Sequence, residues 1–116
     1  MYHSVIRSVG GYLPERRLLN TDLEKMVETS DSWIRERTGI CERRLAAENE
    51  TTATLAIEAG QEALKNAGLN GADMDLVIVA TTTPDDTLPA TAVTVQREIG
   101  MVSGFAFDIQ AACSGF

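Results

Sequence analysis

The sequence predicts an α/β fold built around a mostly parallel sheet. Residues 75–81 and 105–109 are apolar runs with the length and the β-branched or aromatic content of buried strands. Between them, a helix is expected from Pro89, at a first helical position, to Gly100. Strand, helix and strand in this order predict a βαβ unit, with parallel strands and a right-handed crossover.

The N-terminal segment gives weaker signals. Residues 4–9 have the character of a strand, which Gly10 and Gly11 end. Pro14 keeps the residues around it in a loop, because the residue before a proline is biased away from the helical region. Residues 21–24 match a capping box, which predicts that a short helix opens there.

Two further helices have recognisable ends. Ser30 is the expected N-cap of a helix that Gly39 closes. Residues 40–45 are then predicted to form a short strand or an extended link. Thr51 opens a longer helix, whose mostly small apolar side chains recur every three or four residues until Gly68 stops it. Such a face predicts close packing against a neighbouring element.

Composition and charge exclude several functions. The net charge of −7 makes nucleic acid a poor candidate partner. No stretch approaches the roughly 20 apolar residues that span a bilayer, and the N-terminus lacks the features of a signal peptide. Two cysteines do not predict a disulfide framework, so a cytoplasmic location is expected. His3 is the only histidine, and no residues show metal-ligand spacing, so no metal is expected.

Cys113 is the main candidate for a catalytic side chain. It lies in residues 111–116, whose pattern is typical of a tight turn and the first turn of a helix after the strand 105–109. Free backbone N–H groups and the helix dipole stabilise a thiolate at such a turn. These local features fit a buried structural cysteine equally well. The position past the carboxyl end of a βαβ strand, where ligands bind in open α/β sheets, favours the nucleophile.

Trp33 and Arg37 form a second candidate site. They are four residues apart and share a helix face, so they suit a ligand with a flat base and phosphates. Taken alone, a tryptophan that covers the core beside a solvated arginine is the more ordinary interpretation. Eight of the ten basic residues lie within residues 1–44, so a phosphorylated ligand would have to bind there. Cys41, with no helix start or histidine beside it, is interpreted as structural.

The sequence resembles bacterial β-ketoacyl-acyl carrier protein synthase III, the condensing enzyme that initiates type II fatty acid synthesis. The segments that carry the resemblance are Gly11-Tyr12-Leu13-Pro14, Thr29-Ser30-Asp31-Ser32-Trp33-Ile34, Arg37-Thr38-Gly39-Ile40, Val79-Ala80-Thr81-Thr82 and Ala112-Cys113-Ser114-Gly115-Phe116. They follow the family's order but cover only its N-terminal part. The resemblance therefore implies that residues 1–116 are the N-terminal part of a thiolase-like condensing-enzyme domain, an incomplete α/β half.

The resemblance also assigns roles to residues. Cys113 matches the catalytic cysteine, while the family's histidine and asparagine lie downstream. Four residues match positions that bind coenzyme A: Thr29, Trp33, Arg37 and Thr38. This reverses the structural interpretation of the tryptophan and arginine. Leu88 matches a position, often phenylalanine, that shapes the acyl pocket across a dimer interface. Cys41 stands where the family commonly has arginine, which weakens any binding role there.

The implied reaction is a decarboxylative Claisen condensation. Cys113 takes the acyl group of an acyl-coenzyme A, with acetyl-coenzyme A as the expected donor, and malonyl-acyl carrier protein supplies the carbanion. Coenzyme A is then part of a substrate and no cofactor is implied. The enzyme is expected to be a cytoplasmic homodimer without a nucleic acid or membrane partner, and this fragment alone is expected to be inactive.

The sequence leaves two alternative functions open. A related thiolase-fold acyltransferase would use the same acyl-cysteine chemistry on another acceptor. A non-catalytic scaffold would bind coenzyme A or acyl carrier protein, and the nucleophile Cys113 argues against it.

Overall fold

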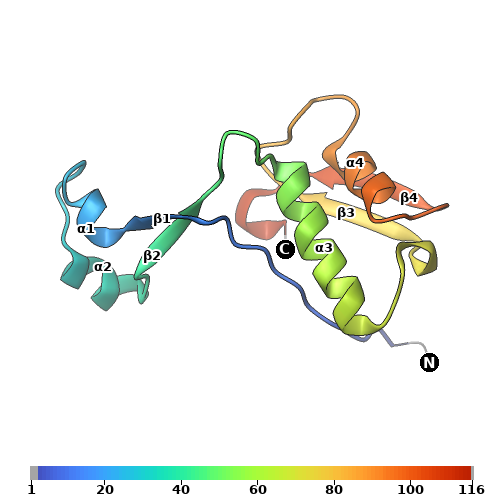
Figure 1. Cartoon of the computed structure of the whole chain (residues 1–116), viewed down its shortest axis with the longest axis horizontal. Coiled ribbons are helices and arrows are strands. Elements are labelled where there is room, and N and C mark those ends of the chain that lie inside the picture. The colour runs from blue at the N-terminus through green and yellow to red at the C-terminus, as the bar shows by residue number, and fades with distance from the viewer. Residues whose placement is uncertain (1–2, 116) are drawn as a thin grey trace. The chain divides into compact units, whose positions relative to one another are not determined.

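The computed structural model describes residues 3–115 (Figure 1). In chain order the elements are β1 (Arg16–Leu19), α1 (Asn20–Leu23), α2 (Asp31–Thr38), β2 (Glu42–Leu45), α3 (Thr52–Ala67), β3 (Leu76–Ala80), α4 (Thr91–Glu98) and β4 (Phe105–Ile109), with 3₁₀ turns at Gly71–Asp73 and Ala112–Ser114. They belong to two compact units. The smaller unit is Leu13–Asn49, and the larger unit combines the residues up to Tyr12 with those from Glu50 onward.

The βαβ unit that the sequence predicts is present in the larger unit. Strands β3 and β4 pair in parallel, from Leu76 opposite Phe105 to Ala80 opposite Ile109. Helix α4 connects them, and β4 has the predicted bounds. Both strands therefore end at the same edge of the sheet, and the residues that follow them are brought together there.

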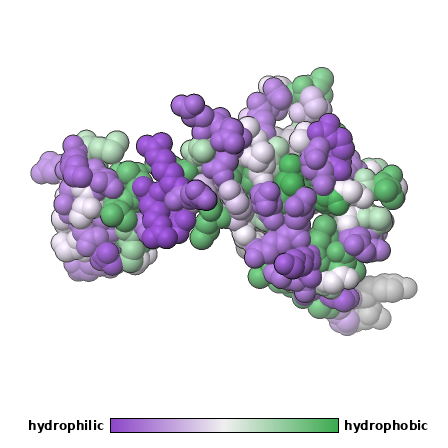
Figure 2. Space-filling view, in the orientation of Figure 1, coloured by the Kyte–Doolittle hydropathy of each residue, from purple (hydrophilic) through white to green (hydrophobic). Residues whose placement is uncertain are grey.

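One face of this small sheet carries the core. Val79 from β3 packs with Ala92 and Val95 from α4, and apolar side chains of α3 pack against this cluster. On the other face Leu76 and Ile78 remain about half exposed, at 48% each. The strands are thus buried on one face only among the described residues, because α3 and α4 cover the same face. Figure 2 shows apolar side chains at the surface of the larger unit, among polar ones.

Helix α4 begins later than predicted. Its first residue is Thr91, so Pro89 precedes the helix and does not open it. The residue at the N-cap, Ala90, has no side chain that can cap the helix. The carboxylate of Asp108 in β4 takes this role and accepts hydrogen bonds from the backbone N–H groups of Thr91 and Ala92, at 2.8 and 2.7 Å. A contact from a distant strand therefore sets the start of the helix.

Helix α3 has the predicted ends. Thr51 is its N-cap, and Gly68 closes it in the left-handed conformation with φ of 67°. The carboxylate of Asp85 also accepts hydrogen bonds from the backbone N–H groups of Thr52 and Ala53, at 2.8 and 2.9 Å. Burial alone would raise the pKa of Asp85, but hydrogen bonds from residues 51–53 outweigh it and lower this pKa. The stabilisation by Asp85 is therefore present above its unfolded pKa of about 3.9 and lost as the pH falls through the folded-state pKa.

The segment before Tyr12 is not the strand that the sequence predicts. Residues 4–9 pair with no described strand and run along α3 instead. The Ser8 hydroxyl donates to the Ala63 carbonyl at 2.7 Å, and the Asn66 amide donates to the Val9 carbonyl at 3.0 Å. A Cβ atom on Gly10 would lie 2.3 Å from the Ala63 backbone nitrogen, so only glycine permits this close approach.

The smaller unit contains an antiparallel pair of strands, β1 and β2, in which Arg16 lies opposite Leu45 and Leu19 opposite Glu42. Strand β2 agrees with the predicted extended segment, whereas β1 was not predicted. Helix α1 is a single turn that starts at Asn20, one residue before the predicted capping box. Helix α2 has the predicted ends: the Ser30 hydroxyl accepts a hydrogen bond from the Trp33 N–H at 3.1 Å, and Gly39 is left-handed with φ of 71°.

Asn20 joins the elements of the smaller unit. Its side chain is buried, with the residue 1% exposed. The amide nitrogen donates to an Asp31 carboxylate oxygen and to the Ile40 carbonyl, both at 2.8 Å. The amide oxygen accepts a hydrogen bond from Arg43. This one side chain therefore links α1, α2 and β2, and all of its polar atoms are satisfied.

We predict that Asp108→Ala lowers the free energy of unfolding by about 1–2 kcal/mol, because two N–H groups of α4 lose their acceptor. Urea denaturation followed by circular dichroism measures the change. Asp86→Ala is the control, since it removes the same charge from an exposed position. Equal destabilisation by both substitutions would contradict the capping role of Asp108.

Candidate active site

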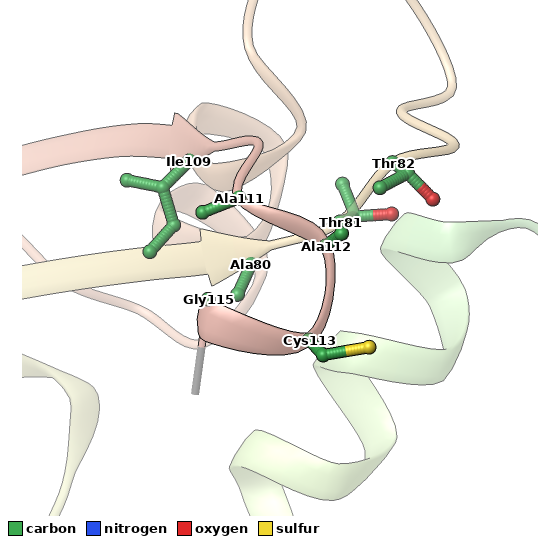
Figure 3. A pocket seen from close by; sticks show the side chains of 8 residues that line it. All are labelled: Ala80, Thr81, Thr82, Ile109, Ala111, Ala112, Cys113 and Gly115. Carbon is green, nitrogen blue, oxygen red and sulfur yellow. The ribbon is translucent and has the colours of Figure 1, made fainter.

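An open pocket of about 480 Å³ lies at the carboxyl ends of β3 and β4 (Figure 3). Its lining residues are Ala80, Thr81, Thr82, Ile109, Ala111, Ala112, Cys113 and Gly115. The parallel register puts the segments after both strands at one edge, where ligands bind in open α/β sheets. Cys113 thus lines a pocket at the place that the sequence predicts.

Cys113 lies in the 3₁₀ turn Ala112–Ser114, and its thiol side is exposed. The described residues form this single turn rather than the predicted first turn of an α-helix, and Phe116 lies outside them. Within the turn, the Ser114 N–H donates to the Ala111 carbonyl at 2.9 Å, and the Gly115 N–H donates to the Ala112 carbonyl at 3.2 Å. Among residues 3–115, the Cys113 N–H has no acceptor and is available to a ligand.

The backbone bends sharply at Ala112, immediately before Cys113. Ala112 has φ of 45°, in the left-handed region that favours glycine. A residue with a side chain in this region costs about 1–2 kcal/mol, and such strain is concentrated at functional sites. The bend confirms the prediction of a tight turn at the cysteine.

Thr81 and Thr82 also line this pocket, and the sequence did not identify them as site residues. The Thr81 N–H donates to the Ile109 carbonyl at 3.1 Å, which extends the parallel ladder by one bond. The Gln110 side chain donates to the Thr82 carbonyl at 3.4 Å. The available signal was the polar run directly after an apolar strand, since loops at that edge line ligand sites.

The chemistry of this pocket is that of a single nucleophile. Cys113 is the only titratable side chain among its lining residues. His3 is not among those residues, so the described part of the chain brings no histidine to the thiol. The geometry supports attack by sulfur on a carbonyl carbon, with the Cys113 N–H as a donor to the oxygen.

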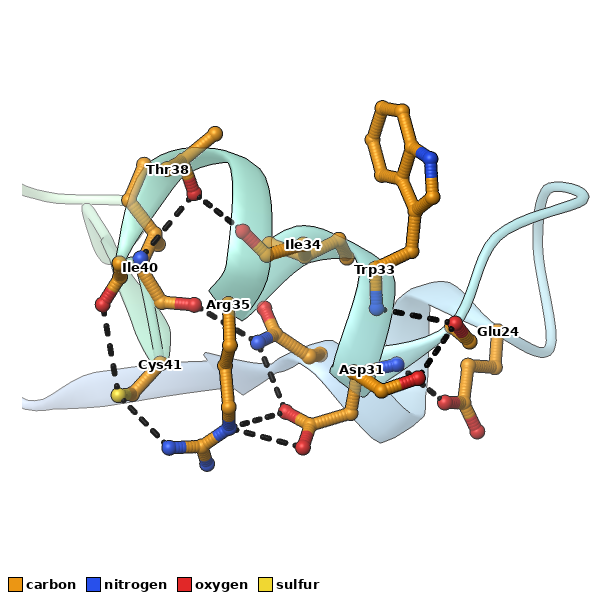
Figure 4. Close-up of polar contacts among 12 residues, drawn as sticks. Glu24, Asp31, Trp33, Ile34, Arg35, Thr38, Ile40 and Cys41 are labelled. Carbon is orange, nitrogen blue, oxygen red and sulfur yellow. Dashed lines mark hydrogen bonds and ion pairs between the residues drawn. The ribbon is translucent and has the colours of Figure 1, made fainter.

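Trp33 is exposed on α2, which contradicts its interpretation as a residue that covers the core. The residue is 55% exposed, and its ring points away from the helix (Figure 4). The guanidinium carbon of Arg37 lies 5.9 Å from the centre of the indole ring, a cation–π distance. An exposed aromatic plane beside a cation suits a ligand that carries both a base and a phosphate.

Thr29 and Trp33 line a second pocket, of about 340 Å³, together with Glu28 and Ser30. This pocket lies in the smaller unit, whereas the Cys113 pocket lies in the larger unit. Thr38 does not line it. The Thr38 hydroxyl donates to the Ile34 carbonyl at 2.7 Å and accepts a hydrogen bond from the Ile40 N–H at 3.1 Å, so it stabilises the end of α2.

Cys41 belongs to a polar network around Arg35 (Figure 4). Arg35 donates through one Nη atom to the Cys41 sulfur at 2.9 Å and through Nε to the Asp31 carboxylate at 2.8 Å. The hydrogen bond from Arg35, with a second from Asn20, lowers the pKa of Asp31, and the same contact with Asp31 raises the pKa of Arg35. Cys41 lines neither of the two pockets above.

Leu88 lies in the loop between β3 and α4 and is 88% exposed. It does not line the Cys113 pocket of its own chain. Among residues 3–115, no three histidine, cysteine, aspartate or glutamate side chains are grouped as metal ligands. None of the described helices is long and apolar enough to cross a membrane.

Comparison with known proteins identifies relatives along the whole chain, although no family model matches it. The β-ketoacyl-[acyl-carrier-protein] synthase III of Brucella canis is 56% identical over 116 residues, which are 100% of this chain and 36% of the relative. The enzyme of the same name from Rhizobium rhizogenes has the same identity and coverage. The chain therefore spans about a third of the length of the curated relatives it matches.

Solved structures show the same similarity. The 3-oxoacyl-[acyl-carrier-protein] synthase III from Aquifex aeolicus superposes with a TM-score of 0.87 and 51% identity, over 96% of this chain and 36% of that one. The priming β-ketosynthase of the R1128 polyketide pathway gives a TM-score of 0.88 and 36% identity, over 96% of this chain and 33% of that one. With its thiolase-like α/β fold and its similarity along all 116 residues, the chain is a homologue of about a third of β-ketoacyl-[acyl-carrier-protein] synthase III.

Proposed function

We propose that the protein to which this chain belongs is the initiating condensing enzyme of type II fatty acid synthesis, with Cys113 as its nucleophile. The observation that carries this proposal is an exposed cysteine in a pocket at the carboxyl edge of a βαβ unit. The chain around it is 56% identical to β-ketoacyl-[acyl-carrier-protein] synthase III. In this proposal the enzyme acts as a cytoplasmic homodimer.

The first half-reaction transfers an acyl group to sulfur. The Cys113 thiolate attacks the thioester carbonyl of an acyl-coenzyme A, with acetyl-coenzyme A as the expected donor. The free Cys113 N–H stabilises the oxyanion of the tetrahedral intermediate, and one such donor contributes about 3–4 kcal/mol in well-studied enzymes. The carbon–sulfur bond to coenzyme A then breaks, coenzyme A leaves as a thiolate, and the acyl group stays on Cys113.

The second half-reaction forms the carbon–carbon bond. Malonyl-acyl carrier protein loses carbon dioxide, and the electron pair of the broken bond attacks the acyl carbon on Cys113. The Cys113 thiolate leaves and is regenerated. Since the described pocket contains no histidine or other acid, we assign the stabilisation of this step to the family's histidine and asparagine, in the rest of the enzyme.

The smaller unit is proposed to bind the coenzyme A part of the donor. The exposed indole of Trp33 offers a plane for the adenine, and Arg37 beside it offers a charge-assisted contact to a phosphate. Thr29 lines the same pocket as Trp33 and adds a polar contact. Thr38 contributes mainly by holding the end of the helix that carries both residues.

A different condensing enzyme with the same acyl-cysteine chemistry is the second candidate. Among the structural relatives are the priming β-ketosynthase of a polyketide pathway, at 36% identity, and a tetronic acid condensing enzyme, at 31%. The residues described above serve acylation, which these enzymes would share. Condensation assays with malonyl-acyl carrier protein as the acceptor separate this candidate from the proposed enzyme.

We predict that incubation of the full-length enzyme with radiolabelled acetyl-coenzyme A leaves the acyl label on Cys113, because this thiol lines the pocket with a free N–H beside it. Peptide mapping after proteolysis locates the label. Cys41→Ala serves as the control and should retain full labelling. Undiminished labelling of Cys113→Ala would refute the assigned nucleophile.

We further predict that Arg37→Ala raises the KM for acetyl-coenzyme A about tenfold or more, since a hydrogen bond to a charged group contributes about 1.5–3 kcal/mol. The KM for acetyl-pantetheine, which lacks the 3′-phosphoadenosine group, should change much less. Steady-state kinetics with both donors measure this, and Arg97→Ala, at an exposed arginine of the larger unit, is the control. Equal effects on the two donors would exclude a phosphate contact.

Leu88 is proposed to lie in the wall of the neighbouring subunit's acyl pocket, where relatives often carry phenylalanine. Its smaller side chain leaves room for primers longer than acetyl or branched. We predict that Leu88→Phe lowers the ratio of kcat/KM for butyryl- to acetyl-coenzyme A by about fourfold per methylene excluded, equivalent to about 0.8 kcal/mol each. Val102→Phe, at another exposed apolar position, is the control. An unchanged ratio in Leu88→Phe would show that this residue does not set chain length.

A further inference from the structure

Hydrogen bonds attach the first residues of the loop 81–90 to helix α3. The Thr52 hydroxyl donates to the Thr83 carbonyl at 2.6 Å. Two residues further on, the Asp85 carboxylate accepts the backbone N–H groups of Thr52 and Ala53 at 2.8 and 2.9 Å. The first half of the loop is thereby attached to the N-terminus of α3.

Thr91, which directly follows the loop, fixes its other end. Its side chain is buried, with the residue 2% exposed, and its hydroxyl accepts a hydrogen bond from the Asp85 N–H at 3.3 Å. Its own N–H donates to Asp108 at 2.8 Å, which fixes Thr91 against β4. The bond between Asp85 and Thr91 therefore joins the two ends of the intervening segment, residues 86–90.

Residues 86–90, called the loop tip below, make few polar contacts with the rest of the described chain. Among the described residues, they make no hydrogen bond outside the first turn of α4 and no ion pair. Leu88 lies in the middle of this tip and is 88% exposed. A short segment fixed at both ends samples far fewer conformations than one that is fixed at a single end. The direction of Leu88 thus depends on how Asp85 and Thr91 hold the tip.

We propose that Asp85 and Thr91 are positioning residues for primer selection, because the bond between them closes the loop tip and so orients Leu88. Neither residue lines the Cys113 pocket, so they act on chain-length preference and not on the nucleophile. This inference rests on the proposed function, including the role of Leu88 in the acyl pocket. According to this proposal, selectivity for primer chain length depends on the Thr91 hydroxyl, although this group contacts no substrate.

A pair of substitutions at Thr91 tests the hydroxyl in the full-length enzyme. Thr91→Val keeps the shape of the side chain and removes the acceptor, whereas Thr91→Ser keeps the acceptor. The ratio of kcat/KM for butyryl- to acetyl-coenzyme A should change about threefold or more in Thr91→Val, since each methylene that the pocket gains or loses changes the ratio about fourfold. Thr91→Ser should keep the wild-type ratio.

A second pair tests the attachment of the loop without altering the buried threonine. Asp85→Ala removes the carboxylate from the N-terminus of α3. Asp86→Ala makes the same change in charge at the next position, which has no hydrogen bond or ion pair to another described residue. Asp85→Ala should shift the primer ratio in the same way as Thr91→Val, and it tests the positioning of the loop tip even if Thr91→Val does not fold.

Labelling of Cys113 by acetyl-coenzyme A is measured in every variant, because it separates the two proposals. A shifted ratio in Thr91→Val and Asp85→Ala, with normal labelling and unshifted controls, supports the positioning role. Wild-type ratios in both variants overturn it, as do equal shifts in Thr91→Ser and Asp86→Ala. Absence of the label on Cys113 in the wild-type enzyme contradicts the proposed function itself.

Discussion

The larger unit depends on the contact between the Asp108 carboxylate and the start of α4. The first N–H groups of a helix have no partner within it, and the N-cap Ala90 supplies none. Asp108 satisfies two of them and places a negative charge at the positive end of the helix dipole. Because Asp108 lies at the end of β4, the same contact fixes the strand from which the turn at Cys113 departs. Asp85 does the same for α3, so both helices on the covered face of the sheet begin at a carboxylate from another segment.

The smaller unit is organised by polar contacts more than by an apolar core. Asn20 is its buried centre, and its amide holds a carboxylate, a backbone carbonyl and an arginine from three elements. Since each of its polar atoms has a partner, burial of this side chain costs little and specifies one arrangement. Helix α2 is held in place by the buried side chain of Ile34 and by the contact of Asp31 with Asn20. The indole of Trp33 takes no part in this packing and stays exposed. An aromatic ring exposed in this way is available to a ligand, which the resemblance implied and which the helix pattern alone did not favour.

Local signals account for what could be predicted from the sequence. Ser30, Gly39, Thr51 and Gly68 were all assigned correctly as helix ends, because a cap needs only residues within one turn. The parallel pairing of β3 and β4 followed from two apolar runs separated by one helix, since a short crossover leaves few alternatives. Cys113 at a bend after β4 followed from the same order of elements and from its small neighbours.

Tertiary contacts determined the rest. The sequence by itself established the order of the main elements, the βαβ unit and the position of the cysteine at its edge. Only the tertiary structure decided that Arg16–Leu19 is a strand and that residues 4–9 are not, because a strand exists only where a partner lies beside it. It also decided that α4 starts at Thr91, where Asp108 caps it, rather than at Pro89, and that Thr81 and Thr82 line the same pocket as Cys113. These features join residues far apart in the chain, so no local pattern encodes them.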